Sequence, residues 1–588
     1  SVRLFEKFDE GKMADAVKEE AAKKPAFMVI SLAGQKVADE VKKLELPVFA
    51  MNAGYDLGQD AKVMNFVGQD GHSAGRIVGE KLIKALPEMK KGFFINAEQG
   101  NTAMGARGTG MKSALEEAGL SFEEVVVPAD DEEGCASVLK EKLAGDDPFG
   151  VAIGANSAVK AVLDRLKAVE AKTASVAFDL SGSVFDAIKA GELVAAVDQQ
   201  PWLQGYLPVV LGALHVRSGQ RIPQPMLSTG PRLVTEPPSP AHAACIAGDK
   251  CADPKELKVS AVLHALDGNQ FWDRVQLGAE AAARDLGVQL SFERPPSAKT
   301  VVPYLKQKLK ERSSNSSNRS ALIVSLPLSA LDPAVKEAAA KLPTIGANAG
   351  GPECPSVGCL TFVGQNETSA GEQAGKHLVS ERKCKKPACV LRNATQRMFA
   401  RRCEGFFQGS TSAGAAPAAK YVEVGKEGAG QKLKELTEKG KPDCVLLTSN
   451  GLLKTWKEAK LGSDASLAVF DLSADAVESV HDKEVEFLVD QQPFVQGYLP
   501  VVLLVVKLQT GLQLVDTWVS SGPALDTAQV LSQEHVACLD EGFPVCDPKP
   551  LTEAFSMAEP WRAPPASPFG PVASGLFCLL LGGGVILA

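Results

Sequence analysis

Five polar side chains that could contact a small ligand occur twice in this chain of 588 residues. Four of the five follow apolar runs, and the arginine begins a predicted helix. The first set is Asn52, Arg107, Asn156, Asp179 and Gln199, and the second is Asn348, Arg402, Asn450, Asp471 and Gln491. Together they offer donors and acceptors to hydroxyl groups on several sides, as a sugar or polyol requires. Any one of them could be a turn or cap residue instead, but the recurrence of all five favours a ligand site.

Signatures of catalysis are weak by comparison. The chain has no G-x-x-x-x-G-K-[ST] loop, no H-E-x-x-H and no G-x-S-x-G motif. Asp198 and Asp490 could act as bases in a hydrolase or lyase, but no second repeated carboxylate accompanies them. Cys354 and Cys359 have the spacing of half a zinc site and lack a second pair. We therefore predict a protein that is not an enzyme, with no catalytic residue, metal or cofactor.

The polar residues belong to a larger internal repeat. Residues 197–210 read VDQQPWLQGYLPVV and residues 489–502 read VDQQPFVQGYLPVV, 292 positions later. Such a long period indicates a duplicated domain and not a solenoid, whose repeats span about 20–50 residues. Asparagine, aspartate and glutamine at strand ends would meet where open α/β sheets bind their ligands.

Strand-like runs rich in Val, Ile and Leu alternate with helical segments of about 10–15 residues, which predicts an α/β fold with parallel, doubly wound sheets. The first half is predicted to be truncated at its N-terminus. Residues 1–8 align with 288–294, and nothing corresponds to the strand and helix of 258–287. In a 2-1-3-4-5 strand order the missing strand would lie inside the sheet. The predicted units are residues 1–235, a linker at 236–257, residues 258–530, a Cys/Pro-rich tail at 531–571 and a hydrophobic segment at 572–588.

Composition argues for a secreted or surface protein. The net charge of −8 speaks against nucleic-acid binding. Four pairs of near-neighbour cysteines predict short disulfides, and four Asn-x-Ser/Thr sequons predict a glycoprotein. The pairs are Cys245/Cys251, Cys354/Cys359, Cys384/Cys389 and Cys538/Cys546, and the sequons are Asn315, Asn318, Asn366 and Asn393.

The apolar run at 572–588 has three interpretations. It resembles the signal for a glycolipid anchor, it reaches the lower length limit of a membrane-spanning helix, and it could be a buried C-terminal strand. Membrane attachment is the favoured interpretation, and it places the chain at the cell surface.

Each half resembles a type I periplasmic binding protein of the ribose/galactose group. The resemblance rests on Pro-Val-x-x-x-Asn-x-Gly-like, Val-Gly-Gln, Phe-Asp-Leu-Ser and Asp-Gln-Gln-Pro-x-x-Gln-Gly-Tyr-Leu-Pro motifs. These lie at 47–54, 67–70, 178–181 and 198–208, and again at 343–350, 363–366, 470–473 and 490–500. The family implies two doubly wound lobes around a ligand cleft in each repeat, with the ten polar residues as ligand contacts. In the second repeat it adds Asn269, Phe271 and Trp272.

The resemblance implies non-enzymatic binding of a sugar or polyol and a membrane transport or signalling partner. Ribose itself is doubtful, because ribose binders carry Asp-Arg where this chain has Asn52-Ala53 and Asn348-Ala349. The alternative function is a receptor or adhesion ectodomain whose clefts have lost sugar binding and which recognises proteins.

Overall fold

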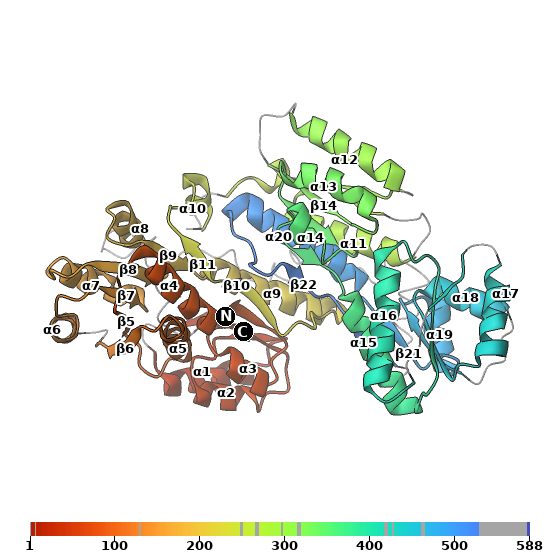
Figure 1. Ribbon diagram of the computed structural model, residues 1–588, viewed down its shortest axis with the longest axis horizontal. Coiled ribbons are helices and arrows are strands. Elements are labelled where there is room, and N and C mark those ends of the chain that lie inside the picture. Colours follow the sequence, from red (N-terminus) through yellow and green to blue (C-terminus); the bar gives the residue numbers. More distant parts are fainter. Residues whose placement is uncertain are drawn as a thin grey trace.

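The computed structural model describes residues 2–5, 8–128, 131–246, 251–264, 270–295, 298–313, 319–416, 421–425, 428–459, 465–527 and 585–587. These residues form four sheets of six strands, two in each half of the chain. The halves lie side by side, with the first repeat coloured red to yellow and the second green to blue (Figure 1). The predicted α/β architecture of two lobes in each of two repeats is therefore confirmed.

The first repeat contains one sheet in the order β1-β24-β2-β3-β4-β10 and a second in the order β11-β9-β8-β7-β5-β6. The strands are β1 (Val2–Leu4), β2 (Met28–Ile30), β3 (Val48–Asn52), β4 (Phe66–Gln69), β5 (Lys91–Asn96), β6 (Ser121–Val126), β7 (Phe149–Ile153), β8 (Thr173–Phe178), β9 (Ala195–Asp198), β10 (Met226–Gly230), β11 (Arg232–Val234) and β24 (Val585–Leu587). The helices are α1 (Glu10–Ala22), α2 (Gln35–Val41), α3 (Tyr55–Asp60), α4 (Gly71–Ala85), α5 (Thr102–Glu117), α6 (Glu132–Lys142), α7 (Val159–Leu166), α8 (Gly182–Lys189) and α9 (Pro201–Ser218), with a short 3₁₀ turn at Asn156–Ala158.

The second repeat has the sheet orders β13-β12-β14-β15-β16-β22 and β18-β17-β19-β20-β21-β23. Its strands are β12 (Lys258–Val262), β13 (Gln289–Glu293), β14 (Ser320–Val324), β15 (Thr344–Ala347), β16 (Phe362–Val363), β17 (Pro387–Leu391), β18 (Val422–Glu423), β19 (Cys444–Leu447), β20 (Ser466–Phe470), β21 (Phe487–Asp490), β22 (Trp518–Val519) and β23 (Ala524–Asp526). Its helices are α11 (Gln270–Leu286), α12 (Ala298–Ser313), α13 (Asp332–Ala339), α14 (Cys354–Val357), α15 (Glu367–Arg382), α16 (Arg397–Ser412), α17 (Ala429–Glu435), α18 (Asn450–Glu458), α19 (Ala474–His481) and α20 (Pro493–Thr510).

The first sheet of the second repeat has the expected 2-1-3-4-5 order, with β12 paired in parallel to β13 and β14. In the first repeat, β1 takes the position of β13, in line with the sequence alignment. The position of β12 is held by β24, which pairs antiparallel with both β1 and β2. Within the C-terminal apolar run, the structure thus describes a strand at 585–587, and the two chain ends lie close together (Figure 1).

Local sequence explains why the same elements form twice. The central strands of each lobe are continuous apolar runs that are fully buried, as expected for parallel sheets covered on both faces. Asp70 caps α4 by accepting from Ser73 N, and Asn366 caps α15 by accepting from Ser369 N. The chain passes between the two sheets of each repeat three times, because β4, β9 and β10 are each followed by a strand of the other sheet.

The contacts between the repeats are reciprocal. Gln200 donates to Gln513 O at 2.6 Å and accepts from Gln513 N at 2.9 Å. Gln492, which is 292 positions after Gln200, bonds in the same way to the backbone N–H and carbonyl of Arg221, which is 292 positions before Gln513. Such a pattern defines an isologous interface, in which the same surface of each copy meets the other.

A second reciprocal pair extends this interface. Ser228 N donates to Asp516 at 2.6 Å, and Ser520 N donates to Gln224 at 3.0 Å. The apolar core is also continuous across the boundary, because it contains Leu211 of α9 and Val495 of α20. The two repeats therefore form one packed body with an approximate two-fold axis.

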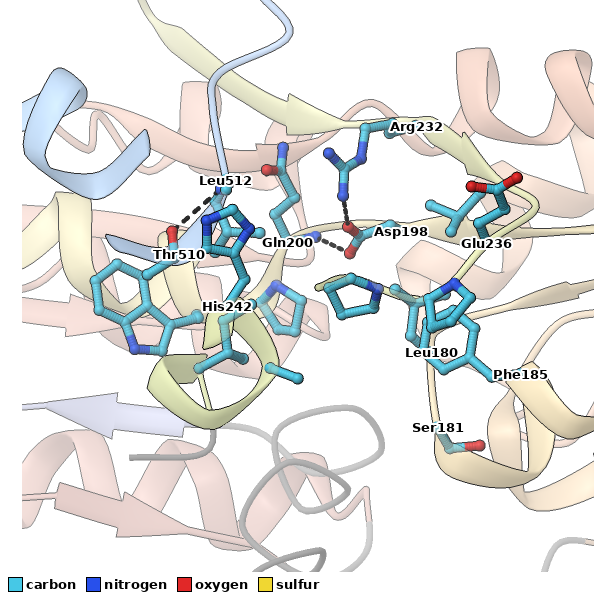
Figure 2. Close-up of a pocket in the computed structure, with 18 of the residues that line it drawn as sticks. Leu180, Ser181, Phe185, Asp198, Gln200, Arg232, Glu236, His242, Thr510 and Leu512 are labelled. Carbon is cyan, nitrogen blue, oxygen red and sulfur yellow. Dashed lines mark hydrogen bonds and ion pairs between the residues drawn. The ribbon is translucent and has the colours of Figure 1, made fainter. Parts of the chain in front are cut away.

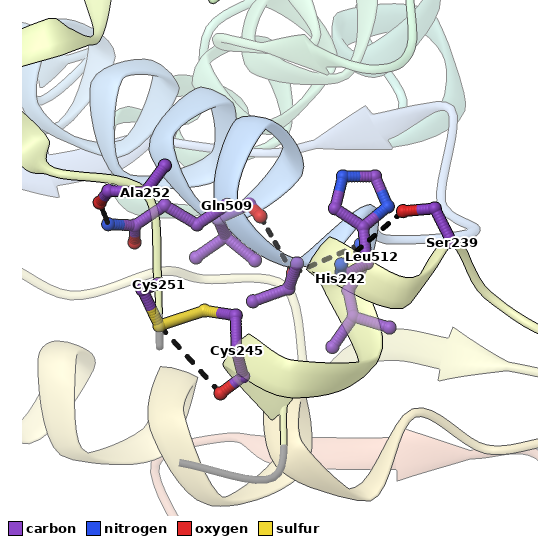
Figure 3. The surroundings of a disulfide bond; sticks show 9 residues. Ser239, His242, Cys245, Cys251, Ala252, Gln509 and Leu512 are labelled. Carbon is purple, nitrogen blue, oxygen red and sulfur yellow. Dashed lines mark hydrogen bonds between the residues drawn. A yellow bond between two sulfur atoms is a disulfide. The ribbon is translucent and has the colours of Figure 1, made fainter. Parts of the chain in front are cut away.

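The linker is held against the second repeat. It contains helix α10 (Pro240–Ile246) and a 3₁₀ turn at Pro254–Glu256, and a Cys245–Cys251 disulfide closes the loop between them. Gln509, near the end of α20, donates to Ala252 O at 3.1 Å (Figure 3). α20 is the helix of the described chain with the length and composition to cross a bilayer, and most of it is buried inside the protein.

The predicted cysteine pairing is only partly correct. Cys245–Cys251 is confirmed, but Cys384 is bonded to Cys444 and Cys389 to Cys403, so the predicted Cys384/Cys389 pair is wrong. The reason is sheet topology: β17 and β19 are neighbours, which brings Cys444 beside the start of β17. Cys354 and Cys359 are free thiols. Cys538 and Cys546 lie outside the described residues, as do the sequon residues Asn315 and Asn318.

Candidate functional site

A cavity of about 670 Å³ lies between the two lobes of the second repeat. Of the eight side chains predicted for this repeat, seven line it, and the eighth, Asn269, lies outside the described residues. The seven are Phe271, Trp272, Asn348, Arg402, Asn450, Asp471 and Gln491. They come from α11, from the ends of β15 and β21, from α16 and α18, and from the turn after β20.

Backbone geometry places two of these residues. Asn348 and Asp471 have φ angles of 65° and 72°, so each turns the chain sharply at the end of a strand. Asparagine and aspartate tolerate this left-handed conformation better than most residues. The turn function considered from the sequence is thus real, and it coexists with a place in the cavity wall. Asn348 Nδ2 also donates to Gln496 Oε1 at 3.0 Å.

Arg402 is the charged centre of the cavity and is only 2% exposed. Its Nε and Nη2 donate to the Glu367 carboxylate at 2.7 and 3.1 Å, and Nη1 donates to Thr448 O at 2.7 Å. Burial alone would lower the pKa of Arg402, but the carboxylates of Glu367 and Asp471 outweigh it and raise the pKa. The guanidinium is therefore a permanent cation held in one orientation.

Asp471 lies on the other side of this guanidinium, with its Oδ2 3.8 Å from Arg402 Nη1. Burial raises the pKa of Asp471, while Arg402 and a hydrogen bond donated by Gln491 act in the opposite direction. Two carboxylates and one guanidinium thus share the base of the cavity. This arrangement presents fixed acceptors and donors to a neutral polar ligand without leaving a lone buried charge.

An aromatic wall faces these polar groups. The rings of Phe271 and Trp272 lie 5.3 Å apart, and the His264 ring lies 4.9 Å from Trp272. Burial lowers the pKa of His264 to about 3, so the imidazole is neutral at physiological pH. Its Nδ1 lies 2.7 Å from Ser325 Oγ. A wall of this kind can cover the C–H face of a sugar ring.

Several lining residues were not predicted from the sequence. Besides His264, the cavity is lined by Arg392, Asn393, Gln396, Met398, Phe399, Glu423, Gly425, Ser449 and Gly451. Most come from the loop after β17, the start of α16 and the end of β18. They lack first-repeat counterparts of the same type, so the repeat comparison gave no signal for them. Glu367 is also new: the aligned first-repeat residue is Gly71.

The first repeat places its five predicted residues in a related but sparser arrangement. Arg107 Nη1 donates to Gly154 O at 2.8 Å, which matches the Arg402 contact with Thr448, and Arg107 Nη2 lies 4.0 Å from Asp179. Gln199 donates to Asp179, as Gln491 does to Asp471. Asn52, like Asn348, has a positive φ, of 64°.

The remaining first-repeat contacts differ in charge. Asn156 Oδ1 accepts from Ser181 Oγ at 3.2 Å. With glycine at the position of Glu367, no second carboxylate forks onto Arg107. Glu98 lies nearby instead; burial raises its pKa to about 7, against the effect of Arg107. None of the five predicted residues lines the largest cavity described beside this repeat, which measures about 780 Å³.

One cluster has metal-like spacing within the described part of the chain. It consists of Cys384, Asp443 and Cys444. The two cysteines are joined to each other in a disulfide, which removes their thiolates as ligands.

Comparison with known proteins agrees with this geometry. A family model described as a periplasmic binding protein domain matches residues 2–220 and 261–512. The xylose/arabinose-binding protein XylF of Sulfolobus acidocaldarius is 25% identical over 205 residues, which is 32% of this chain and 50% of that protein. The chain thus spans about half the length of this curated relative.

Solved structures resemble one repeat at a time. A carbohydrate transporter from Acidothermus cellulolyticus in complex with myo-inositol is 25% identical, with a TM-score of 0.41, and covers 48% of this chain and 97% of its own. The glucose-galactose binding protein GanP of Geobacillus stearothermophilus is 20% identical, with a TM-score of 0.41, over 47% and 99% of the two chains. Because the family model matches both halves, the chain belongs to the periplasmic binding protein domain family, in tandem duplicate.

Proposed function

We propose that the second repeat binds a small sugar or polyol between its lobes, without converting it chemically. The observation that carries this proposal is the composition of the 670 Å³ cavity, where an aromatic wall faces a fixed guanidinium, two carboxylates and several amides. Its volume falls within the range of about 300–1,000 Å³ usual for small-molecule sites. Neutral hydroxylated rings match such a mixture, because they need apolar cover on their faces and hydrogen bonds at their rims.

Two further facts support binding without catalysis. The family consists of substrate-binding proteins, and the curated relative is named for binding xylose and arabinose. In the cavity, Arg402 is engaged by Glu367 and Thr448 O, and Asp471 by Gln491. These groups are held by one another, which suits recognition better than proton transfer.

The five residues of the first repeat are proposed as a second, modified site. Their charge pattern differs because Glu367 has no counterpart there, so the two repeats are expected to prefer different ligands. A location outside the cytoplasm is supported by the family and by the three disulfides. Glycosylation, membrane attachment through 572–588 and a membrane transport or signalling partner stay predictions.

Thermal shift and calorimetry with xylose, arabinose, glucose, galactose and myo-inositol test the proposal. A ligand at a concentration 100 times its dissociation constant should stabilise the repeat that binds it by about 2.7 kcal/mol. Asp471→Asn should weaken the binding about 10-fold to 100-fold, because a charge-assisted hydrogen bond is worth about 1.5–3 kcal/mol. Asp179→Asn is the matched control: it makes the same change at the equivalent position of the first repeat and should leave second-repeat binding intact.

Two outcomes would contradict the proposal. If no sugar or polyol shifts the unfolding of the folded wild-type chain, the alternative of a protein-recognising receptor or adhesion ectodomain becomes the better account. If a sugar is consumed at a rate that Asp471→Asn or Asp490→Asn abolishes, the protein is an enzyme.

A further inference from the structure

Helix α9 exposes an apolar stripe whose equivalent in the second repeat is covered. Positions 202, 206, 209, 213 and 216 are spaced by four and three residues, so they share one face of the helix. They are Trp202, Tyr206, Val209, Ala213 and Val216, and are called the α9 stripe here. The first four are half-buried, and Val216 is 49% exposed.

The same positions of α20 show what covers such a stripe. Phe494, Tyr498, Val501 and Val505 are at most 9% exposed. α11 lies against them, and fourteen residues of α20 are buried, compared with eight of α9. The stripe residues themselves are alike in the two copies: Trp202 stacks on Tyr206 at 4.8 Å, and Phe494 on Tyr498 at 5.9 Å.

Glycine marks the crossing point of the two helices in the second repeat. A Cβ on Gly278 of α11 would lie 2.0 Å from Phe494 O, and a Cβ on Gly497 of α20 would lie 1.8 Å from Val275 O. The backbones are therefore in direct contact, and any side chain at either glycine would separate them. Gly205 is the counterpart of Gly497 in α9, yet a Cβ there would meet no atom of the described residues within 4 Å.

The large cavity of about 780 Å³ adjoins the first turn of the same helix. Its lining includes Pro201 and Trp202, and its polar end is the ion pair of Asp198 with Arg232, at 2.9 Å (Figure 2). Leu180, Phe185 and His242 also border it. The equivalent end of α20 is the place where the first turns of α11 lie.

We propose that the α9 stripe, together with this cavity, is a docking site for an amphipathic helix of the α11 type, with a glycine at its crossing point. The occupant's chemistry follows from the second repeat, where α11 sits on the same residues. Seated in the same way, the first turn of the docked helix would reach the first cleft, as Phe271 and Trp272 reach the second.

Electrostatics adds one requirement that α11 itself does not meet. In the second repeat Arg274 of α11 lies near Asp490 and lowers its pKa, against burial and the charge of Asp526, which raise it. In the first repeat Arg232 already neutralises Asp198, and the residue aligned with Arg232 is Ala524. The docked helix should therefore carry a neutral residue at the position of Arg274, because a second guanidinium would be repelled by Arg232.

A peptide of residues 270–287, labelled for fluorescence polarisation, tests the site on the full chain. We expect saturable one-to-one binding, and tighter binding by the R274Q peptide. The G278L peptide should bind at least about 10-fold more weakly, because its leucine blocks the backbone contact. Gly205→Leu in the protein should cause the same loss, while its melting temperature is maintained, because the site is open and leucine favours the helix over glycine.

The overturning results are specific. Absence of saturable binding to the wild-type chain, or equal binding of the unmodified and G278L peptides, would refute the docking site. Sedimentation supplies the competing occupant: if the wild-type chain is a dimer and Gly205→Leu makes it a monomer, the stripe is covered by a second copy of the chain and the helix proposal is wrong.

Discussion

Replacing Gln492 with alanine should loosen the attachment of the two repeats to each other. The Gln492 side chain is 4% exposed. It donates to the carbonyls of Arg221 and Ser521, and its Oε1 accepts from Arg221 N at 2.8 Å. Alanine removes all three bonds and leaves the backbone groups of Arg221 facing the tightly packed side chains of Leu211 and Val495.

The magnitude follows from these three bonds. A net hydrogen bond contributes about 0.5–1.5 kcal/mol, and leaving a buried partner unsatisfied costs about 1–3 kcal/mol. We expect Gln492→Ala to lower the free energy of unfolding by about 2–4 kcal/mol. Gln200→Ala removes the equivalent bonds to Gln513 and should have a similar effect. The double variant should show the sum within about 0.5 kcal/mol if the two sites act independently.

Urea unfolding followed by circular dichroism and by tryptophan fluorescence measures these differences. The continuous core predicts coincident transitions for the wild type, and separate transitions for the double variant as the repeats become independent. Gln373→Ala is the control: this glutamine bonds only to Ser369 on an exposed face of α15, so its loss should change nothing. If Gln492→Ala is as stable as Gln373→Ala, the reasoning about sheltered bonds across the interface is wrong.

Three further predictions concern pH, glycosylation and disulfides. Burial, with Asp526, raises the pKa of Asp490 to about 7, so its protonation stabilises the fold below about pH 4 and this stability is lost as pH rises through 7. Asp490→Asn should gain about 1–3 kcal/mol over the wild type at pH 8 and nothing at pH 4 in urea titrations; equal gains would contradict this. Asn393 lines the cavity, so protein from a glycosylating host should bind sugar more weakly than its Asn393→Gln variant, and equal affinities of glycosylated protein and variant would refute the blocking role. Non-reducing peptide mapping should recover Cys384 linked to Cys444, and its removal should cost about 4 kcal/mol for a loop of 60 residues; recovery of Cys384 linked to Cys389 would show the pairing to be wrong.

The sequence predicted the features that depend on local pattern or on the repeat. Alternating strands and helices, the interior position of β12 and the grouping of Arg402 with Asp471 and Gln491 could all be inferred, because each relies on a strand end or on a motif present twice. These are also the features that backbone hydrogen bonding and strand direction largely determine.

Features that depend on non-local neighbours were missed or wrong. Cys384 pairs with Cys444 because β17 lies beside β19, and spacing along the chain cannot reveal that adjacency. His264 and Glu367 are unique to the second repeat, so the comparison of halves did not point to them. The reciprocal amide contacts of Gln200 and Gln492 were also unforeseen, since both residues belonged to a motif interpreted as part of the cleft.

The reciprocal interface has a consequence for how the protein can change. A symmetric pair made from two separate chains dissociates on dilution, and every substitution appears on both sides at once. Here both partners are joined in one polypeptide, so their association does not depend on protein concentration, and each side can vary alone. Arg232 opposite Ala524 and Gly71 opposite Glu367 are examples of such one-sided variation. A joined pair can therefore keep one binding repeat while the other takes on a different task.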